Sequence, residues 1–244
     1  MMRFGVYCFL LFVICCTSCK KKTEPLPDAD PVSTTMALQL DYITDNGSFQ
    51  TNAFTYTTPA GYPYSVTKLE YYLSQICLLR SDSSKLLMQN YQYVDATQPQ
   101  TNTLSYSNPP TGNYIGISFN IGLIPSQNTT GALPEVNDNI NMQWPDPMGG
   151  GYHFLKMEGY YKDAGVPQGY AMHLGTNKCL IPTLLYKKFS ISTGSEVILK
   201  PLMNINSWFR SPYKFDFNKD GNYIMGNDTA MLKITANGKN VFSL

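Results

Sequence analysis

The sequence has 244 residues, a net charge of +1, 43% hydrophobic residues and only 14% charged residues. A nucleic-acid-binding protein needs a basic surface, and a disordered chain combines low hydrophobicity with high net charge, so the composition argues against both classes. The length suffices to bury a core in one or two domains. Eighteen tyrosines and few charges are typical of an extracytoplasmic β-rich protein, in which aromatic strands alternate with polar turns.

Residues 1–18 predict a lipoprotein signal peptide. Arg3 precedes an apolar run over residues 4–16, which matches the apolar region of a signal peptide and is shorter than the ~20 residues of a spanning helix. The run ends in the sequence CTSC, and small residues directly before a cysteine resemble a bacterial lipobox. Cys19 is therefore the predicted lipidation site.

Two alternatives to that assignment stay open: acylation at Cys15 or Cys16, and a plain secretory signal. Residues 19–35 are expected to form the acylated N-terminus and a flexible tether, because the segment is Pro-rich and polar without periodicity. The expected location is extracytoplasmic, lipid-anchored to a bacterial membrane, with the outer membrane favoured. Of the remaining cysteines, Cys77 and Cys179 either form a disulfide or are two buried free thiols.

Residues 36–244 predict one all-β domain, an antiparallel β-sandwich or open barrel. Runs of alternating apolar residues are separated by Gly, Pro and Asn clusters, as in proteins of many short strands. A single helical turn is expected at residues 206–209. A short C-terminal helix is expected over residues 229–236, capped by Asn227 or Asp228 and ended by Asn237 and Gly238. The expected strands cover residues 36–43, 65–80, 87–94, 114–121, 152–161, 169–174, 184–192 and 196–199.

The sequence lacks the signatures of common catalytic sites, including a nucleophile elbow, a zinc-protease helix motif and a phosphate-binding loop. We therefore expect no enzymatic activity. Asp216, Asn218 and Asp220, followed by Gly221, match the start of a calcium loop, but Asn227 stands at the twelfth position, where a bidentate Glu is required. Calcium is thus not the expected cofactor, and an Asp/Asn turn is the simpler interpretation.

The two histidines that follow the signal region, His153 and His173, are the candidate metal ligands, because imidazole suits copper. A structural role for each on its strand is the competing interpretation. A hairpin turning near Val166 would place His173 opposite about Gly159, and roughly 20 Å of strand would then separate it from His153. A joint site would need another strand pairing or a bend at residues 149–151.

Five segments in this order resemble the MbnP-like domain family of lipoproteins and periplasmic proteins of Gram-negative bacteria. The resemblance spans residues 36–244. Its segments cover residues 66–76, 112–122, 142–144, 151–159 and 173–175. It implies a β-rich extracytoplasmic domain that binds copper through histidines and a tryptophan oxidised to kynurenine by means of a dihaem partner enzyme.

The family's site residues map onto His153, His173 and Trp144. The first strand of copper-binding members carries a histidine for which this sequence offers only Asp41 and Tyr42. The resemblance therefore predicts a membrane-anchored lipoprotein that binds copper, with an incomplete histidine set. The alternative is a glycan- or protein-binding scaffold lipoprotein that keeps only the fold, suggested by the many aromatic residues.

Trp144 is expected in a loop or at a strand end, because Pro145 and Pro147 cannot donate ladder hydrogen bonds. The glycines at residues 149–151 then allow a tight return of the chain into the next strand. That return predicts that the indole lies over the first residues of this strand, near His153. The indole is interpreted as a lid on the core, as the oxidisable tryptophan of the family, or as a stacking platform for a ligand.

Overall fold

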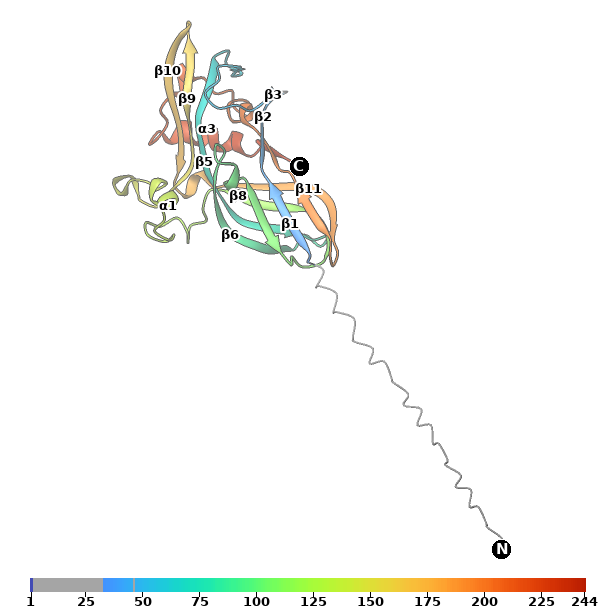
Figure 1. The fold of residues 1–244 in the computed structure, drawn as a ribbon. Helices are drawn as coiled ribbons and strands as arrows, with labels where there is room; N and C mark the ends of the chain where they lie inside the picture. Colours follow the sequence, from blue (N-terminus) through green and yellow to red (C-terminus); the bar gives the residue numbers. More distant parts are fainter. Residues whose placement is uncertain (2–32, 46) are drawn as a thin grey trace. The chain divides into compact units, whose positions relative to one another are not determined.

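The computed structural model describes Met1, residues 33–45 and residues 47–244. The predicted signal peptide, Cys19 and most of the predicted tether lie outside the described residues. The described residues from 33 onward belong to one compact unit (Figure 1). No described helix combines the length and apolar character that crossing a membrane requires.

A seven-stranded antiparallel sheet has the long strand β5 (Pro63–Leu79) at its centre. β5 pairs with β9 along its first half and with β8 along its second half, and Figure 1 shows β5 beside the β9–β10 hairpin. β4 and β6 also pair with β5, and the remaining order is β10-β9-β5-β8-β11. The other bounds are β4 (Tyr56–Thr57), β6 (Lys85–Asp95), β8 (Gly112–Ile121), β9 (His153–Asp163), β10 (Val166–Gly175) and β11 (Ile181–Ile191).

The first two strands of the domain, β1 and β2, belong to two smaller sheets. The order of one is β12-β1-β7 and that of the other is β14-β13-β2-β3, with parallel pairing of β1 with β12 and of β2 with β13. The single strand expected over residues 36–43 is therefore wrong: it divides at Leu40 into strands of two different sheets. The bounds are β1 (Thr35–Gln39), β2 (Asp41–Thr44), β3 (Gly47–Ser48), β7 (Thr103–Ser107), β12 (Glu196–Leu199), β13 (Leu202–Asn204) and β14 (Phe242–Ser243).

Helices are short, as expected. The C-terminal helix α3 (Asp228–Gly238) is confirmed, and the Asn227 side chain caps it by accepting a hydrogen bond from the Ala230 N–H at 3.1 Å. The predicted turn at 206–209 is confirmed as a 3₁₀ helix, η4 (Ile205–Phe209). The described helices without a sequence prediction are α1 (Asn137–Asn141), α2 (Phe217–Asp220), η1 (Pro99–Thr101), η2 (Asp146–Met148) and η3 (Asn177–Cys179).

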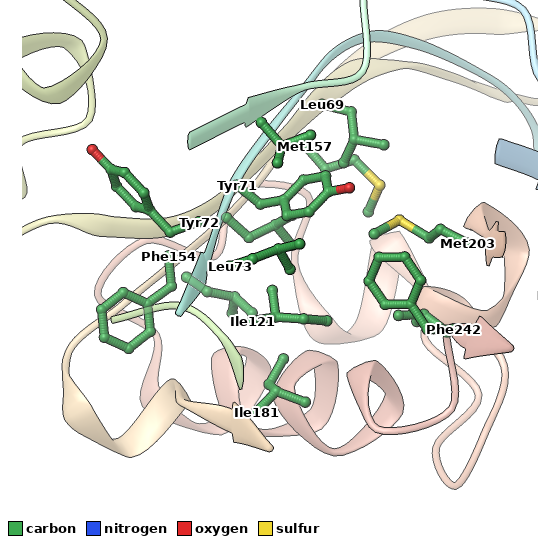
Figure 2. Close-up of a cluster of buried hydrophobic side chains, with 14 of the residues drawn as sticks. Leu69, Tyr71, Tyr72, Leu73, Ile121, Phe154, Met157, Ile181, Met203 and Phe242 are labelled. Atoms are coloured by element: carbon green, nitrogen blue, oxygen red, sulfur yellow. The ribbon is translucent and has the colours of Figure 1, made fainter. Parts of the chain in front are cut away.

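The core joins the central sheet to the small sheets. Ile117, Phe119 and Ile121 of β8 are buried, as the predicted alternation requires. Ile115, predicted on the same face, is only partly buried, and Tyr114 before it is buried instead. Tyr71 and Ile121 of the central sheet face Met203 and Phe242 of the β13–β14 pair (Figure 2). Burial of this apolar area is the main stabilising contribution to the fold. The predicted all-β class with antiparallel sheets and a short C-terminal helix is confirmed.

The two cysteines of the domain are free. Cys77 and Cys179 are both buried and unpaired, which decides between the two alternatives that the sequence leaves open. Burial raises the pKa of both thiols, which favours their protonated form.

Candidate metal site

The turn of the β9–β10 hairpin sets the positions of both histidines. Ala164 and Gly165 take positive φ angles of 47° and 86°, the geometry of a two-residue hairpin turn, so Asp163 pairs with Val166. In this register His173 lies opposite Lys156. The predicted pairing with Gly159 is wrong, because the turn lies at residues 164–165 and not at Val166.

A register shift then brings the two imidazoles together. Leu174 pairs with Leu155 but Gly175 pairs with His153, which leaves Phe154 without a cross-strand partner. His153 and His173 are thereby diagonal neighbours on adjacent strands, and their ring centroids lie 5.1 Å apart with the planes at 90°. The separation of roughly 20 Å expected from the sequence is therefore wrong.

Trp144 completes the cluster. It lies between α1 and η2 with its N–H donated to the Gly151 carbonyl at 2.9 Å, so its predicted loop position is confirmed. Its indole lies 4.8 Å from the His153 ring, as expected, and donates Nε1–H to the Met148 carbonyl at 3.2 Å. A Cβ on Gly175 would come within 2.3 Å of the indole, so the absence of a side chain there creates the space for Trp144. At 2% exposure the indole belongs to the buried core.

Each imidazole has one nitrogen beside a group that can only accept hydrogen bonds. His153 Nδ1 lies 3.2 Å from the Met142 carbonyl oxygen, and His173 Nε2 lies 2.9 Å from Glu158 Oε1. A carbonyl or carboxylate oxygen cannot donate, so these two ring nitrogens carry the protons. In the neutral rings His153 Nε2 and His173 Nδ1 are then left as lone-pair donors.

The surroundings favour a neutral His153. Burial lowers its pKa to about 4, and the neighbouring charges of Lys156 and His173 act in the same direction. The hydrogen bond from His173 lowers the pKa of Glu158 below its ordinary value. The lowered pKa favours the ionised Glu158 carboxylate, which accepts the hydrogen bond of His173 Nε2–H and orients the His173 ring. The sequence analysis did not identify this role of Glu158. The available signal was that Lys156 and Glu158 lie two residues apart on β9 and therefore share one face of the strand.

The protonation of His153 predicts a pH dependence of stability. Its pKa is about 4 in the fold and 6.5 ordinarily, so between these values the unfolded chain binds a proton that the folded chain does not. The full contribution to stability is present above pH 6.5 and is lost as the pH falls toward 4, by about 3 kcal/mol. Urea unfolding of the metal-free protein between pH 7.5 and 4.5 should show a shallower loss for His153→Leu than for wild type. Parallel pH profiles would contradict this assignment.

The segment of the calcium hypothesis makes hydrogen bonds within the protein. Asp216 caps α2 and accepts from the Tyr62 hydroxyl at 3.0 Å and from the Asn218 N–H at 3.1 Å. Asp220 pairs with the Lys233 ammonium, and the Tyr161 hydroxyl donates to Asn218 Oδ1. These oxygens bond to protein donors on several elements. The arrangement favours the Asp/Asn turn over a calcium loop.

Within residues 33–45 and 47–244, no three His, Cys, Asp or Glu side chains are grouped so as to hold a metal ion. A metal at the Trp144–His153–His173 cluster would therefore have the two imidazoles as its ligands from these residue types. That donor set suits a metal of low coordination number that accepts imidazole nitrogen.

The fold and the cluster define a mostly β domain with a histidine pair at the base of a hairpin, beside a buried tryptophan. A family profile described as MbnP matches residues 33–227, and the chain belongs to the MbnP family. The structure is similar to that of MbnP from Methylosinus trichosporium, with a TM-score of 0.52 and 13% identity over 73% of this chain and 78% of that chain. At this identity the likeness shows a shared fold. No curated protein matches the sequence.

Proposed function

We propose that this protein is an extracytoplasmic lipoprotein that binds copper through His153 and His173. One observation carries the proposal: a carbonyl and a carboxylate hold one nitrogen of each ring, so that one nitrogen per ring is free to bind a metal. Histidines that ligate metals almost always donate their other N–H to such an acceptor.

The spacing of the rings fits a shared metal. With metal–nitrogen bonds near 2 Å, as for zinc, the centroids of two imidazoles on one ion are at most about 6 Å apart. The observed 5.1 Å meets this limit. Among the metals that imidazole binds, the association of the MbnP family with copper favours copper.

Trp144 is proposed as a companion of the metal site. Its indole lies 4.8 Å from the His153 ring, and the family resemblance implies oxidation of such a tryptophan to kynurenine with a dihaem partner enzyme. Peptide mass spectrometry of protein from a host that has this enzyme should show a gain of one oxygen and a loss of one carbon at Trp144. An unmodified Trp144 in that host would limit the indole to packing.

The membrane anchor is part of the same proposal. Lipidation at Cys19 predicts incorporation of a labelled fatty acid into the wild-type protein and none into Cys19→Ser, with the wild-type protein found in the membrane fraction. Label on Cys19→Ser would direct the assignment to Cys15 or Cys16.

Copper titration tests the proposal. The domain from residue 20 onward should bind Cu(I) or Cu(II) at least ~100-fold more tightly than the double variant His153→Ala/His173→Ala. Glu158→Gln keeps an amide oxygen for His173 Nε2–H but removes the charge, and changing a group that orients a metal ligand in this way costs about 10–100-fold in metal affinity. The proposal fails if the double variant binds copper as the wild type does.

The alternative, a glycan- or protein-binding scaffold, has less support. It depends on exposed aromatic residues, whereas Trp144 and Trp208 are both buried. Most described tyrosines are buried or partly buried, and those that are exposed are Tyr160, Tyr186, Tyr213 and Tyr223. The proposal assigns no catalytic reaction to the protein.

A further inference from the structure

A trough crosses the face of the central sheet that points away from the core. Cys77 of β5 pairs with Leu87 of β6 and with Ser118 of β8, and Ser118 pairs with Leu184 of β11. The four side chains therefore form one row across four strands. They line a cavity of about 450 Å³, within the range of small-molecule pockets.

The floor of the trough contains a polar group without a partner. Ser118 is 3% exposed, and its buried hydroxyl, like that of Thr183 in the same cavity, has no hydrogen-bond partner of ordinary geometry among the described residues. The Ser118 hydroxyl lies beside Cys77, to whose thiolate it could donate. The Cys77 thiol beside it donates its hydrogen bond to the Gln75 carbonyl at 3.2 Å, so this proton is not available to Ser118. A buried hydroxyl without a partner is destabilising, so the sheet keeps Ser118 here at the expense of stability.

The backbone of β5 is irregular at the same place. Gln75 takes a φ of 51°, a left-handed conformation that is uncommon for this residue type, and the register against β8 shifts between Ser74 and Cys77. Strained residues and bulges concentrate at binding sites, where they redirect side chains. Gln75 itself lines the cavity.

The rims of the trough are apolar and one end is cationic. Leu87 and Leu184 are 48% and 49% exposed, so they present hydrocarbon on either side of the floor. Lys85 also lines the cavity and forms no ion pair with any described residue. Burial raises the pKa of Cys77, and the Lys85 charge and the Ser118 hydroxyl beside the thiol both oppose that increase.

From these features we propose that the trough is a second ligand site, separate from the histidine pair, which binds a small aliphatic carboxylate. The carboxylate pairs with Lys85, the chain lies between Leu87 and Leu184, and the Ser118 hydroxyl donates a hydrogen bond to a ligand oxygen. The site does not depend on copper binding.

Calorimetric titration with octanoate tests the site. Saturable binding of one octanoate is expected. Lys85→Gln should weaken it about 3-fold, as for an exposed ion pair, and Ser118→Ala about 5-fold, for a lost hydrogen bond. Lys239→Gln, at an exposed position after α3, is the matched charge control and should bind as wild type does. Octan-1-ol and butyrate, which lack the charge or the chain length, should bind more weakly.

Two further measurements separate binding from folding. Ser118→Ala removes the unpartnered hydroxyl, so without ligand it should unfold at a temperature at least equal to that of wild type. Octanoate should slow alkylation of Cys77 by N-ethylmaleimide and leave Cys179 unaffected. Absence of saturable octanoate binding, or wild-type affinity in either Lys85→Gln or Ser118→Ala, would overturn the proposal.

Discussion

Gly175→Ala is expected to destabilise the domain by about 3 kcal/mol and to weaken copper binding at least ~10-fold. The new Cβ would lie 2.3 Å from one carbon of the Trp144 indole and 2.7 Å from two others. The indole is buried in a closely packed core and cannot move away without displacing its neighbours, and overpacking of this kind costs about 1–3 kcal/mol. Because the indole also contacts His153, its displacement disturbs the proposed metal ligand.

Urea unfolding and copper titration measure the two effects, and a second variant tests the cause. Trp144→Leu removes the ring that the new methyl group meets, so Gly175→Ala should cost less in that background than in wild type. Gly47→Ala is the matched control, since a Cβ there meets only ordinary contacts at 3.6 Å. Additive costs in the double variant would show that Gly175 acts through something other than Trp144.

Asn237→Ala is expected to destabilise the domain by about 3 kcal/mol. Asn237 is completely buried near the end of α3. Its side chain makes three hydrogen bonds to backbone groups of Trp208 in η4 and of Tyr213, which follows η4. Its amide donates to the carbonyls of Trp208 at 2.8 Å and Tyr213 at 2.7 Å, and its oxygen accepts from the Tyr213 N–H at 2.9 Å. Alanine would leave these backbone groups without partners.

Asn240→Ala is the matched control for this prediction. Asn240 lies three residues further along and makes a single exposed hydrogen bond, to the Ser211 carbonyl at 3.2 Å. Its loss should cost less than ~1 kcal/mol. Equal shifts of the urea midpoint in the two variants would contradict the role assigned to Asn237. The sequence alone presents Asn237 only as part of a helix stop.

The sequence alone determined features that depend only on residues close together in the chain, such as strand faces, the start of a helix and the position of a loop. Alternation along residues 117–121 predicts that Ile117, Phe119 and Ile121 of β8 enter the core, because successive strand residues point to opposite faces. Asn227 marks the start of α3, because its side chain caps the helix within the next turn. The prolines around Trp144 exclude it from a strand interior, and the structure places it in a loop.

Only the tertiary structure decided how distant segments pair. The turn at residues 164–165 and the shift at Phe154 set the hairpin register. Changing this register by a few residues would change the separation of the two imidazoles from contact range to roughly 20 Å. The role of Glu158 follows from the same register. The division at Leu40 depends on two neighbouring strands, β12 and β13, that are more than 150 residues away in the chain. Such pairings reflect the free energy of the whole packed sheet, which no short window of sequence contains.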